Sequence, residues 1–261
     1  MIIAANWKMN LTWDDAQKLA ADMSNLAVNS KVGGSETSEI IIFPPALYAS
    51  FVQKACQAGG LSFGGLSWGG QATHSAASGA FTGDISATMF ASAGAKWQLI
   101  GHSERRTHHQ ESDEMIKDQL SASHEAGLKV VLCVGEDLEQ REAGRAIEVV
   151  TNQIALACAK TDRWEDIVIA YEPVWAIGTG KVAQPQDVFE MHQAIAAFCQ
   201  SELGAARRPQ ILYGGSVKAE NAAELFALDY VDGALVGGAS LDVAQFTGIV
   251  EAAMTQMAQE A

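Results

Sequence analysis

The stretch IVIAYEPVWAIGTGK, residues 167–181, joins a short apolar run to an acid and a glycine-containing loop. The run from Ile167 to Ala170 is rich in β-branched residues, a pattern typical of a buried strand in a parallel sheet. Glu172 follows that run, and Pro173 biases it toward an extended backbone. The glycines of Gly178–Gly180 allow the backbone to bend and to approach a ligand closely. A carboxylate in this position predicts a catalytic base beneath a closing lid, the alternative being an ordinary strand-to-helix loop with a solvated glutamate.

Short apolar runs of the same kind recur along the chain, each followed by a turn and then by sequence with a helical period. Eight such alternations predict an α/β fold, a single (β/α)8 barrel with residues 1–261 as one domain. The competing layout is a doubly wound open sheet, but the Gly-x-Gly-x-x-Gly motif that favours it is absent after the first run, where Asn6–Asn10 stands. The runs predicted as strands are Ile2–Ala5, Ile40–Phe43, Leu61–Leu66, Trp97–Ile100, Val130–Val134, Ile167–Ala170, Ile211–Tyr213 and Ala234–Val236.

Three segments between these runs carry helix signals. Val188–Cys199 and Val243–Met257 each place apolar residues on one helical face. Asp137–Gln140 resembles a capping box, which predicts the start of a helix that extends toward Lys160.

Composition and charge limit the possible partners. Of the 261 residues 48% are apolar, and no apolar run approaches the roughly 20 residues of a membrane-spanning helix. The N-terminal run is short and is followed by Lys8, whereas a secretory signal carries its positive charge first. The four cysteines are scattered without metal-binding spacing, so we expect a cytoplasmic protein. A net charge of −14 argues against binding to nucleic acid or to an anionic membrane.

Residues 67–84 interrupt the alternation with a segment rich in Gly, Ala, Ser and Thr. A loop of that length inside a compact domain usually serves binding. We therefore expect an arm that docks on another subunit, the alternative being a mobile surface loop.

Polar residues and glycines follow several of the predicted strands. In a parallel barrel these positions meet at the carboxyl end, where the chemistry of such enzymes gathers. Glycine loops after the seventh and eighth strands can point backbone N–H groups at a phosphate. The set combines a base, an imidazole, a cation and an anion-binding backbone. Its members are Asn6 and Lys8 after the first strand, His102, Ser103 and Glu104 after the fourth, Glu172 after the sixth, Gly214–Ser216 after the seventh and Gly237–Gly238 after the eighth.

His108 and His109 raise the question of a metal site. Adjacent residues do not share a helix face, and no carboxylate pattern completes a ligand set. We therefore predict no metal site.

Five patterns stand in order along the chain: NWKMN (Asn6–Asn10), GHSERR (Gly101–Arg106), YEPVWAIGTG (Tyr171–Gly180), YGGSV (Tyr213–Val217) and LVGGAS (Leu235–Ser240). Together they resemble the triosephosphate isomerase family in order and spacing, and the resemblance covers essentially the whole chain. It implies a reversible interconversion of dihydroxyacetone phosphate and D-glyceraldehyde 3-phosphate through an enediol intermediate, a reaction of glycolysis and gluconeogenesis. It also implies that neither a metal nor an organic cofactor is required.

The resemblance implies roles for individual residues. Glu172 would remove a proton from one carbon and return it to the next, while His102 polarises the carbonyl oxygen. Lys8 and Asn6 would bind the substrate and stabilise its negative charge. Backbone N–H groups would hold the phosphate, and three further residues would support the site. The phosphate-binding residues are Gly178, Ser216, Gly237 and Gly238, and the supporting residues are Ser103, Glu104 and Tyr213.

The same resemblance implies a homodimer. The core of the arm, Gly79–Asp84, matches the family pattern, so we expect Thr82 to approach the active site of a partner subunit, with Gln71 at the interface. Ala72 departs from the family, which usually has asparagine there. The departure puts in doubt one interface hydrogen bond worth about 0.5–1.5 kcal/mol.

Two other functions remain compatible with the barrel. A Schiff-base aldolase or an indole-forming synthase also binds phosphate in such a fold. An aldolase needs a lysine near a strand end inside the barrel, whereas Lys181 lies in the lid. A non-catalytic descendant that binds a partner protein would be expected to have lost Lys8, His102 or Glu172, and all three are present.

Overall fold

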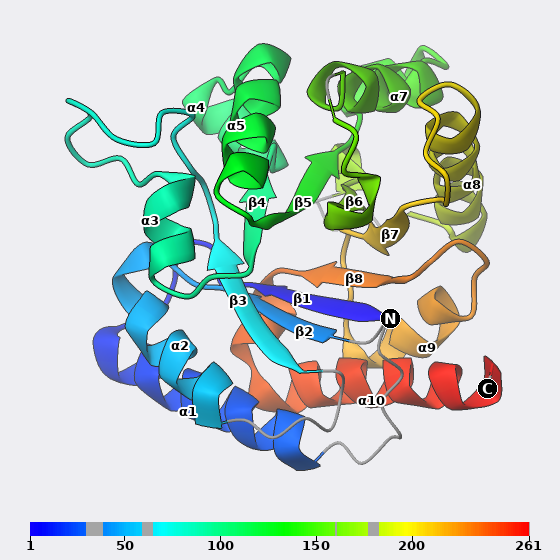
Figure 1. The fold of residues 1–261 in the computed structure, drawn as a ribbon. Coiled ribbons are helices and arrows are strands. Elements are labelled where there is room, and N and C mark those ends of the chain that lie inside the picture. Colours follow the sequence, from blue (N-terminus) through cyan, green and yellow to red (C-terminus); the bar gives the residue numbers. More distant parts are fainter. Residues whose placement is uncertain (30–38, 59–64, 160, 177–182, 261) are drawn as a thin grey trace.

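The computed structural model describes residues 1–29, 39–58, 65–159, 161–176 and 183–260. The strands in these ranges are β1 (Ile2–Asn6), β2 (Glu39–Phe43), β3 (Leu66–Gly70), β4 (Trp97–Ile100), β5 (Lys129–Val134), β6 (Ile167–Tyr171), β7 (Gln210–Tyr213) and β8 (Gly233–Val236). They form a closed parallel barrel in sequence order (Figure 1). Closure is direct, because Ile2 of β1 lies opposite both Glu39 of β2 and Gly233 of β8. The predicted (β/α)8 barrel is confirmed.

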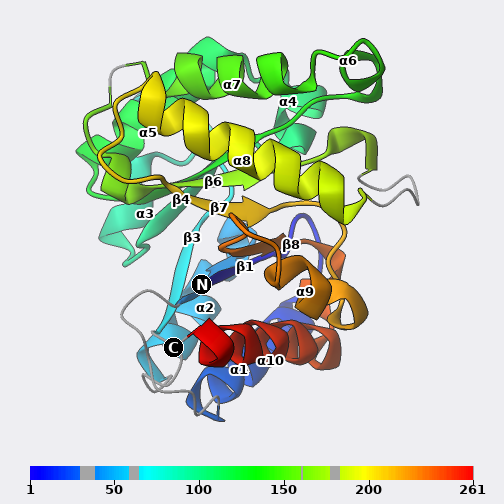
Figure 2. The same cartoon turned by 90° about the vertical axis from the view of Figure 1, so that its right-hand side faces the viewer.

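Helices surround the barrel. In chain order they are α1 (Trp13–Asn29), α2 (Ala49–Ala58), α3 (Ala87–Ser92), α4 (Ser103–His109), α5 (Asp113–Glu125), α6 (Leu138–Glu142), α7 (Ala146–Ala157), α8 (Pro185–Ser201), α9 (Ala219–Phe226) and α10 (Val243–Glu260), with short 3-10 turns η1 (Ala46–Tyr48), η2 (Trp164–Asp166), η3 (Val174–Ala176) and η4 (Gly238–Leu241). Helices α1 and α10 lie side by side in both views, and α7 and α8 cover the opposite flank (Figure 2). Within the described ranges, no helix has the length and apolar character needed to cross a membrane.

The strands are mostly apolar because both of their faces are buried. Successive side chains of a strand point to opposite faces, so Ile2 and Ala4 fill the barrel interior while Ile3 and Ala5 pack against the helices. The same alternation places Cys133 of β5 inside the barrel. This two-sided burial explains why the strands read as continuous apolar runs in the sequence.

The third strand was predicted at the wrong place. The prediction was Leu61–Leu66, of which residues 61–64 lie outside the described residues, whereas β3 spans Leu66–Gly70 and includes the first residues assigned to the arm. Gly69 explains the error, because glycine disfavours strands but is required here. A Cβ atom on Gly69 would lie 2.3 Å from the carbonyl oxygen of Trp97 and 2.6 Å from the ring of Phe43. The close approach of the neighbouring strand therefore requires glycine here, and glycine is a residue that in a sequence usually indicates a turn.

The predicted capping box is present, but the helix that it begins is short. Asp137 Oδ1 accepts from the backbone N–H of Gln140 at 2.8 Å, and Gln140 Oε1 accepts from the N–H of Asp137 at 3.0 Å. The predicted extension to Lys160 is wrong, because Gly144 follows in a left-handed conformation (φ 70°) and separates α6 from α7. The predicted apolar faces of α8 and α10 are confirmed, with Val188, Ile195, Phe246 and Ile249 buried.

Candidate active site

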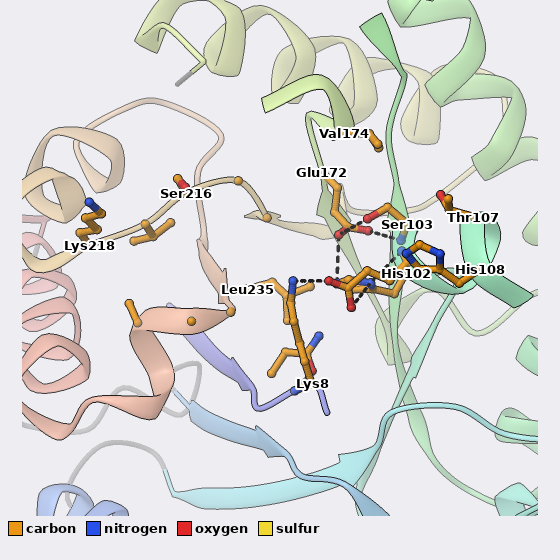
Figure 3. A pocket seen from close by; sticks show the side chains of 18 residues that line it. Lys8, His102, Ser103, Thr107, His108, Glu172, Val174, Ser216, Lys218 and Leu235 are labelled. Atoms are coloured by element: carbon orange, nitrogen blue, oxygen red, sulfur yellow. Dashed lines mark hydrogen bonds and ion pairs between the residues drawn. The ribbon is translucent and has the colours of Figure 1, made fainter. Parts of the chain in front are cut away.

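A cleft of about 580 Å³ opens at the carboxyl end of the barrel. The ends of β1, β4, β6, β7 and β8 line it, which brings together residues far apart in the sequence (Figure 3). Most of the site residues predicted from the sequence contribute to its wall: Asn6, Lys8, His102, Ser103, Glu104, Glu172, Ser216, Gly237 and Gly238. Tyr213 lies behind the wall, Gln71 and Thr82 lie away from it, and Gly178 lies outside the described residues.

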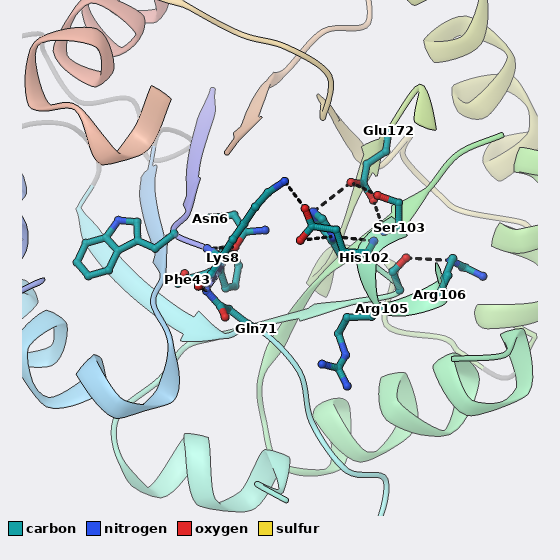
Figure 4. A network of polar contacts seen from close by, with 12 residues as sticks. Asn6, Lys8, Phe43, Gln71, His102, Ser103, Arg105, Arg106 and Glu172 are labelled. Atoms are coloured by element: carbon teal, nitrogen blue, oxygen red, sulfur yellow. Dashed lines mark hydrogen bonds and ion pairs between the residues drawn. The ribbon is translucent and has the colours of Figure 1, made fainter. Parts of the chain in front are cut away.

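Glu172 is the buried acid of the cleft, with 2% of its surface exposed. Its backbone N–H donates to the carbonyl of Val134 at 2.8 Å, which extends the β5–β6 pairing to the position of the acid. Its Oε2 atom accepts from the backbone N–H of Ser103 at 2.9 Å, and Oε1 accepts from Ser103 Oγ at 3.0 Å. Oε1 also lies 3.1 Å from Nε2 of His102. A buried carboxylate needs such donors, and residues at the end of β4 provide all of these (Figure 4).

His102 caps the N-terminus of α4. Its Nδ1 atom accepts from the backbone N–H of Glu104 at 3.2 Å. An Nδ1 atom that accepts carries no proton, so Nε2 holds the proton of a neutral imidazole and points it at Glu172. The loop before His102 is held by Arg106, whose Nε donates to the carbonyl of Gly101 at 2.9 Å.

Lys8 reaches the cleft from the end of β1. Its backbone is left-handed (φ 51°), and its N–H donates to Asn6 Oδ1 at 3.0 Å. Lys8 Nζ pairs with Glu104 Oε1 at 2.6 Å. Burial alone would raise the pKa of the Glu104 carboxyl, but the hydrogen bond from Lys8 and the positive charge of Lys8 outweigh it and lower that pKa. A Cβ atom on Gly237 would lie 3.1 Å from Lys8 Cε, so the lysine crosses directly over the glycine loop after β8.

Gln71 holds the loop that carries Lys8. Its Nε2 atom donates to the carbonyl oxygens of Lys8 at 3.0 Å and Phe43 at 2.8 Å (Figure 4). The sequence prediction gave this residue an interface role only. In the structure its amide links the end of β1 to the end of β2, and thereby fixes the start of the lysine side chain.

Gly214, Gly215 and Ser216 follow β7 on the side of the cleft opposite His102 (Figure 3). A Cβ atom on Gly215 would lie 2.2 Å from the hydroxyl of Tyr213, so the tyrosine ring packs directly beneath the loop. Burial raises the pKa of Tyr213 to about 12. Among the described residues, its hydroxyl has no hydrogen-bond partner.

Sequence reasoning missed a buried network beside Glu172. Glu136, fully buried after β5, accepts from the hydroxyl of Tyr171 at 3.1 Å and from Trp175 Nε1 at 2.8 Å. It also pairs with Arg141 at 3.1 Å, and Arg141 in turn pairs with Asp187 of α8 at 2.5 Å. The network ties the segment after Pro173 to two helices. Glu136 could have been found by its position after a strand, the criterion that identified Glu172.

Thr107, His108, Val174, Leu235 and Lys218 also line the cleft and were not among the predicted site residues. Nothing in the helical periodicity or in the residue types at these positions indicates from the sequence that they line a cleft. His108, considered above only as a metal ligand, is exposed on the rim. In the part of the chain that the structure describes, no group of three or more His, Cys, Asp or Glu residues is arranged to hold a metal ion.

Comparison with known proteins agrees with this geometry. The family model described as triosephosphate isomerase matches residues 1–253. A triosephosphate isomerase of Ruegeria sp. (strain TM1040) is 45% identical over 252 residues, which cover 96% of this chain and 97% of that protein. One of Nitratidesulfovibrio vulgaris (strain Miyazaki F) is 46% identical over 254 residues, covering 95% and 98%. One of Bacteroides fragilis is 41% identical over 254 residues, covering 96% and 98%.

These matches span the barrel from β1 to β8 and therefore include every strand end that contributes to the cleft. The reaction of the family interconverts dihydroxyacetone phosphate and D-glyceraldehyde 3-phosphate, a step of glycolysis and gluconeogenesis. The chain belongs to the triosephosphate isomerase family and is an isomerase of triose phosphates.

Proposed function

We propose that the family's reaction takes place in this cleft, with Glu172 as the base that moves the proton between the two carbons. The observation that carries the proposal is the contact of 3.1 Å between Glu172 Oε1 and His102 Nε2 inside the cleft. A proton abstraction next to a carbonyl needs a carboxylate and a hydrogen-bond donor close together, because negative charge develops on the carbonyl oxygen. A neutral imidazole with its proton on Nε2 meets the second requirement.

Lys8 and Asn6 are proposed to stabilise that negative charge. Lys8 Nζ is paired with Glu104 and crosses over Gly237. An ammonium group in this position is available to both the phosphate and the forming oxyanion. Gln71 and Asn6 hold its backbone in the left-handed conformation, so the cation is already in place before the substrate binds.

Glu172 must leave Ser103 before it acts as a base. Hydrogen bonds to a carboxylate favour its charged form and make it a weaker base. Glu172 accepts from the N–H and the Oγ of Ser103, so both oxygens are engaged. We infer that the bound substrate displaces these donors, which frees a carboxylate oxygen of Glu172 to accept the proton.

Backbone N–H groups of Ser216, Gly237, Gly238 and Gly178 are proposed to hold the phosphate. The first three belong to the loops after β7 and β8 that line the cleft. Gly238 begins η4, and the first backbone N–H groups of a helical turn have no partner within it, so they can donate to an anion. Gly178 is included in this set because of its place in the family pattern.

The test is the initial rate of isomerisation of glyceraldehyde 3-phosphate by the parent chain and by Glu172→Gln. Glutamine keeps the shape and removes the base, so we expect kcat to fall by about 10³-fold or more. Glu172→Asp, which retains the base and shifts it back, should lose less. If Glu172→Gln kept the parent rate while circular dichroism showed an intact fold, the acid would not be the base.

We also propose that the protein is a homodimer, with the part of the predicted arm that follows β3, residues 71–84, docked on a partner subunit and Thr82 approaching the partner's active site. The arm projects from the barrel between β3 and α3 (Figure 1). Its base is closed by a hydrogen bond of 2.9 Å from His74 N to Ile85 O. Phe81 within the arm and Met89 on α3, the helix that follows it, are exposed large apolar side chains that a second copy would cover. A sedimentation coefficient of a monomer at micromolar concentration, with full activity, would reject the dimer.

We further propose that the chain folds as one domain and that the protein is located in the cytoplasm. The pairing of β1 with β8 supports a single domain, because the first and last strands then share one barrel. Cys133, Cys158 and Cys199 are buried and unpaired, as expected for a reducing compartment. Trypsin digestion of the native protein should release no stable fragment if the chain is one domain.

A further inference from the structure

The charged side chains of the cleft are mostly engaged with one another. Lys8 pairs with Glu104 at 2.6 Å, and Glu172 is held by Ser103 and His102. Lys218 is different. It lines the cleft, its side chain is exposed, and it forms no ion pair with any residue that the structure describes. It is therefore the cation of the described cleft wall whose charge is not already offset by a neighbouring carboxylate.

The backbone of Lys218 is fixed relative to the proposed phosphate loop. It stands directly before α9, and its N–H donates to Asn221 Oδ1 at 2.8 Å. Asn221 Nδ2 in turn donates to the carbonyl of Ser216 at 3.1 Å. Figure 3 shows Lys218 beside Ser216, across the cleft from Glu172. The acid nearest along the chain, Glu220, accepts from Gln245 Nε2 at 3.4 Å.

The charge of the whole protein makes such a position important. The net charge is −14, so the average field repels a phosphate dianion. A cation on the rim that is not neutralised locally adds an attraction for the phosphate where the substrate enters. At a separation of about 8 Å in water, Coulomb's law gives an attraction between one positive and two negative charges that corresponds to about a fivefold gain in encounter.

We propose that Lys218 is a positioning residue. It attracts the phosphate group of the substrate to the entrance of the cleft, next to the loops after β7 and β8 that bind it. This role rests on the proposed phosphate site and adds a residue to it. The contribution is electrostatic and acts before chemistry, so it affects kcat/KM and leaves kcat unchanged. It is also screened by salt, because the Debye length is about 30 Å at 0.01 M ionic strength and about 8 Å at 0.15 M.

The experiment compares Lys218→Gln with Lys54→Gln over ionic strengths from about 0.01 to 0.3 M. Lys54 is exposed on α2 and does not line the cleft, so both variants change the net charge by the same amount at different places. We expect kcat/KM of Lys218→Gln to be about threefold to tenfold below the parent at low salt, with the difference closing as salt rises. Lys218→Arg should restore the parent behaviour, and Lys54→Gln should match the parent throughout.

The inhibition constant of inorganic phosphate provides an equilibrium readout that does not depend on turnover. It should rise in Lys218→Gln at low salt and not in Lys54→Gln. Equal kcat/KM and equal salt dependence in the two glutamine variants would overturn the proposal, as would a fall in kcat for Lys218→Gln. Failure of the proposed function is recognised separately, because the Glu172→Gln variant would then keep the rate of the parent.

Discussion

His102 and Glu172 lie in contact on the same side of the cleft, with Nε2 of the histidine 3.1 Å from Oε1 of the acid (Figure 3). They stand at the ends of β4 and β6, which are not neighbours in the barrel, because β5 lies between them. The contact is possible because the strands of a closed barrel converge on one axis at their carboxyl ends. Its geometry leads to testable consequences for catalysis and for stability.

Ser103→Ala removes one of the two serine donors to Glu172 and leaves the backbone N–H in place. A buried carboxylate that loses a donor is destabilised by about 1–3 kcal/mol. We expect a loss of that size in the free energy of unfolding, measured by urea denaturation at neutral pH. Ser121→Ala is the control, since Ser121 Oγ donates only to the carbonyl of Lys117 within one helix. Equal stability of Ser103→Ala and the parent would show that the hydroxyl is not needed to hold the acid.

His102→Gln should lower kcat by about 10²–10³-fold, because the loss of one preorganised donor to a developing oxyanion has that effect. The position of the imidazole proton can be observed independently. At pH 7.5, ¹⁵N NMR of the parent should show a neutral ring with the proton on Nε2 and an unprotonated Nδ1 that accepts from Glu104 N–H. A spectrum with both nitrogens protonated would contradict the proposed electrophile.

His192 should make the protein less stable in weak acid. The ring is fully buried in α8 with Nδ1 3.0 Å from the carbonyl of Tyr230, and burial lowers its pKa to about 4. An unfolded histidine has a pKa near 6.5, so between about pH 6.5 and 4 the unfolded state binds the additional proton. The contribution of His192 to the free energy of unfolding is fully present above about pH 6.5. It decreases as the pH drops toward 4, and at pH 4.5 it is smaller by about 2–3 kcal/mol.

The measurement is the free energy of unfolding of the parent and of His192→Gln at pH 7 and pH 4.5. The difference between the two pH values should be smaller in the variant by about 2–3 kcal/mol. His124, whose pKa burial and Arg163 also lower, stays in both proteins and cancels in the comparison. An unchanged pH dependence in His192→Gln would show that other groups govern the loss of stability.

Gly69→Ala should destabilise the barrel strongly, since the added Cβ would lie 2.3 Å from the carbonyl oxygen of Trp97. We expect a loss above about 3 kcal/mol, or failure to fold, because the obstacle is backbone that cannot move without breaking the β3–β4 pairing. Gly144→Ala gives a matched comparison. It also adds a methyl group, but it meets no atom within 4 Å and has only the strain of its φ of 70° to overcome. Its loss should be about 1–2 kcal/mol in the same urea titration.

The elements that sequence reasoning recovered are those in which local pattern and tertiary environment agree. Strand β6 was predicted to within one residue because both of its faces are buried and its residues are β-branched or apolar. The limits of β3 and the break between α6 and α7 were missed. In both places glycines are required by backbone geometry, at Gly69 by a neighbouring strand and at Gly144 by a left-handed turn.

The site shows the same division. Glu172, His102 and Lys8 were found because each follows a predicted strand, and the topology of a closed barrel brings strand ends together. Glu136 and Lys218 were not identified, although they too lie close to strand ends. Their importance depends on which partners they have: Glu136 gathers three donors, and Lys218 has no ion pair with any described residue. Such pairing is a property of side chains in space and leaves no spacing in the sequence.

The sequence by itself determined the order of strands and helices, the closed barrel that they imply, and the types of residue available at its carboxyl end. It does so because burial of both strand faces requires apolar runs, and because parallel strands require helical connections between them. Only the tertiary structure decided that the Glu172 carboxylate rests on Ser103, that the neutral His102 ring points its proton at that acid, and that Lys8 is engaged with Glu104 while Lys218 is not. These contacts join residues from different strand ends, and their distances are set by the packing of the whole barrel, which no local pattern records.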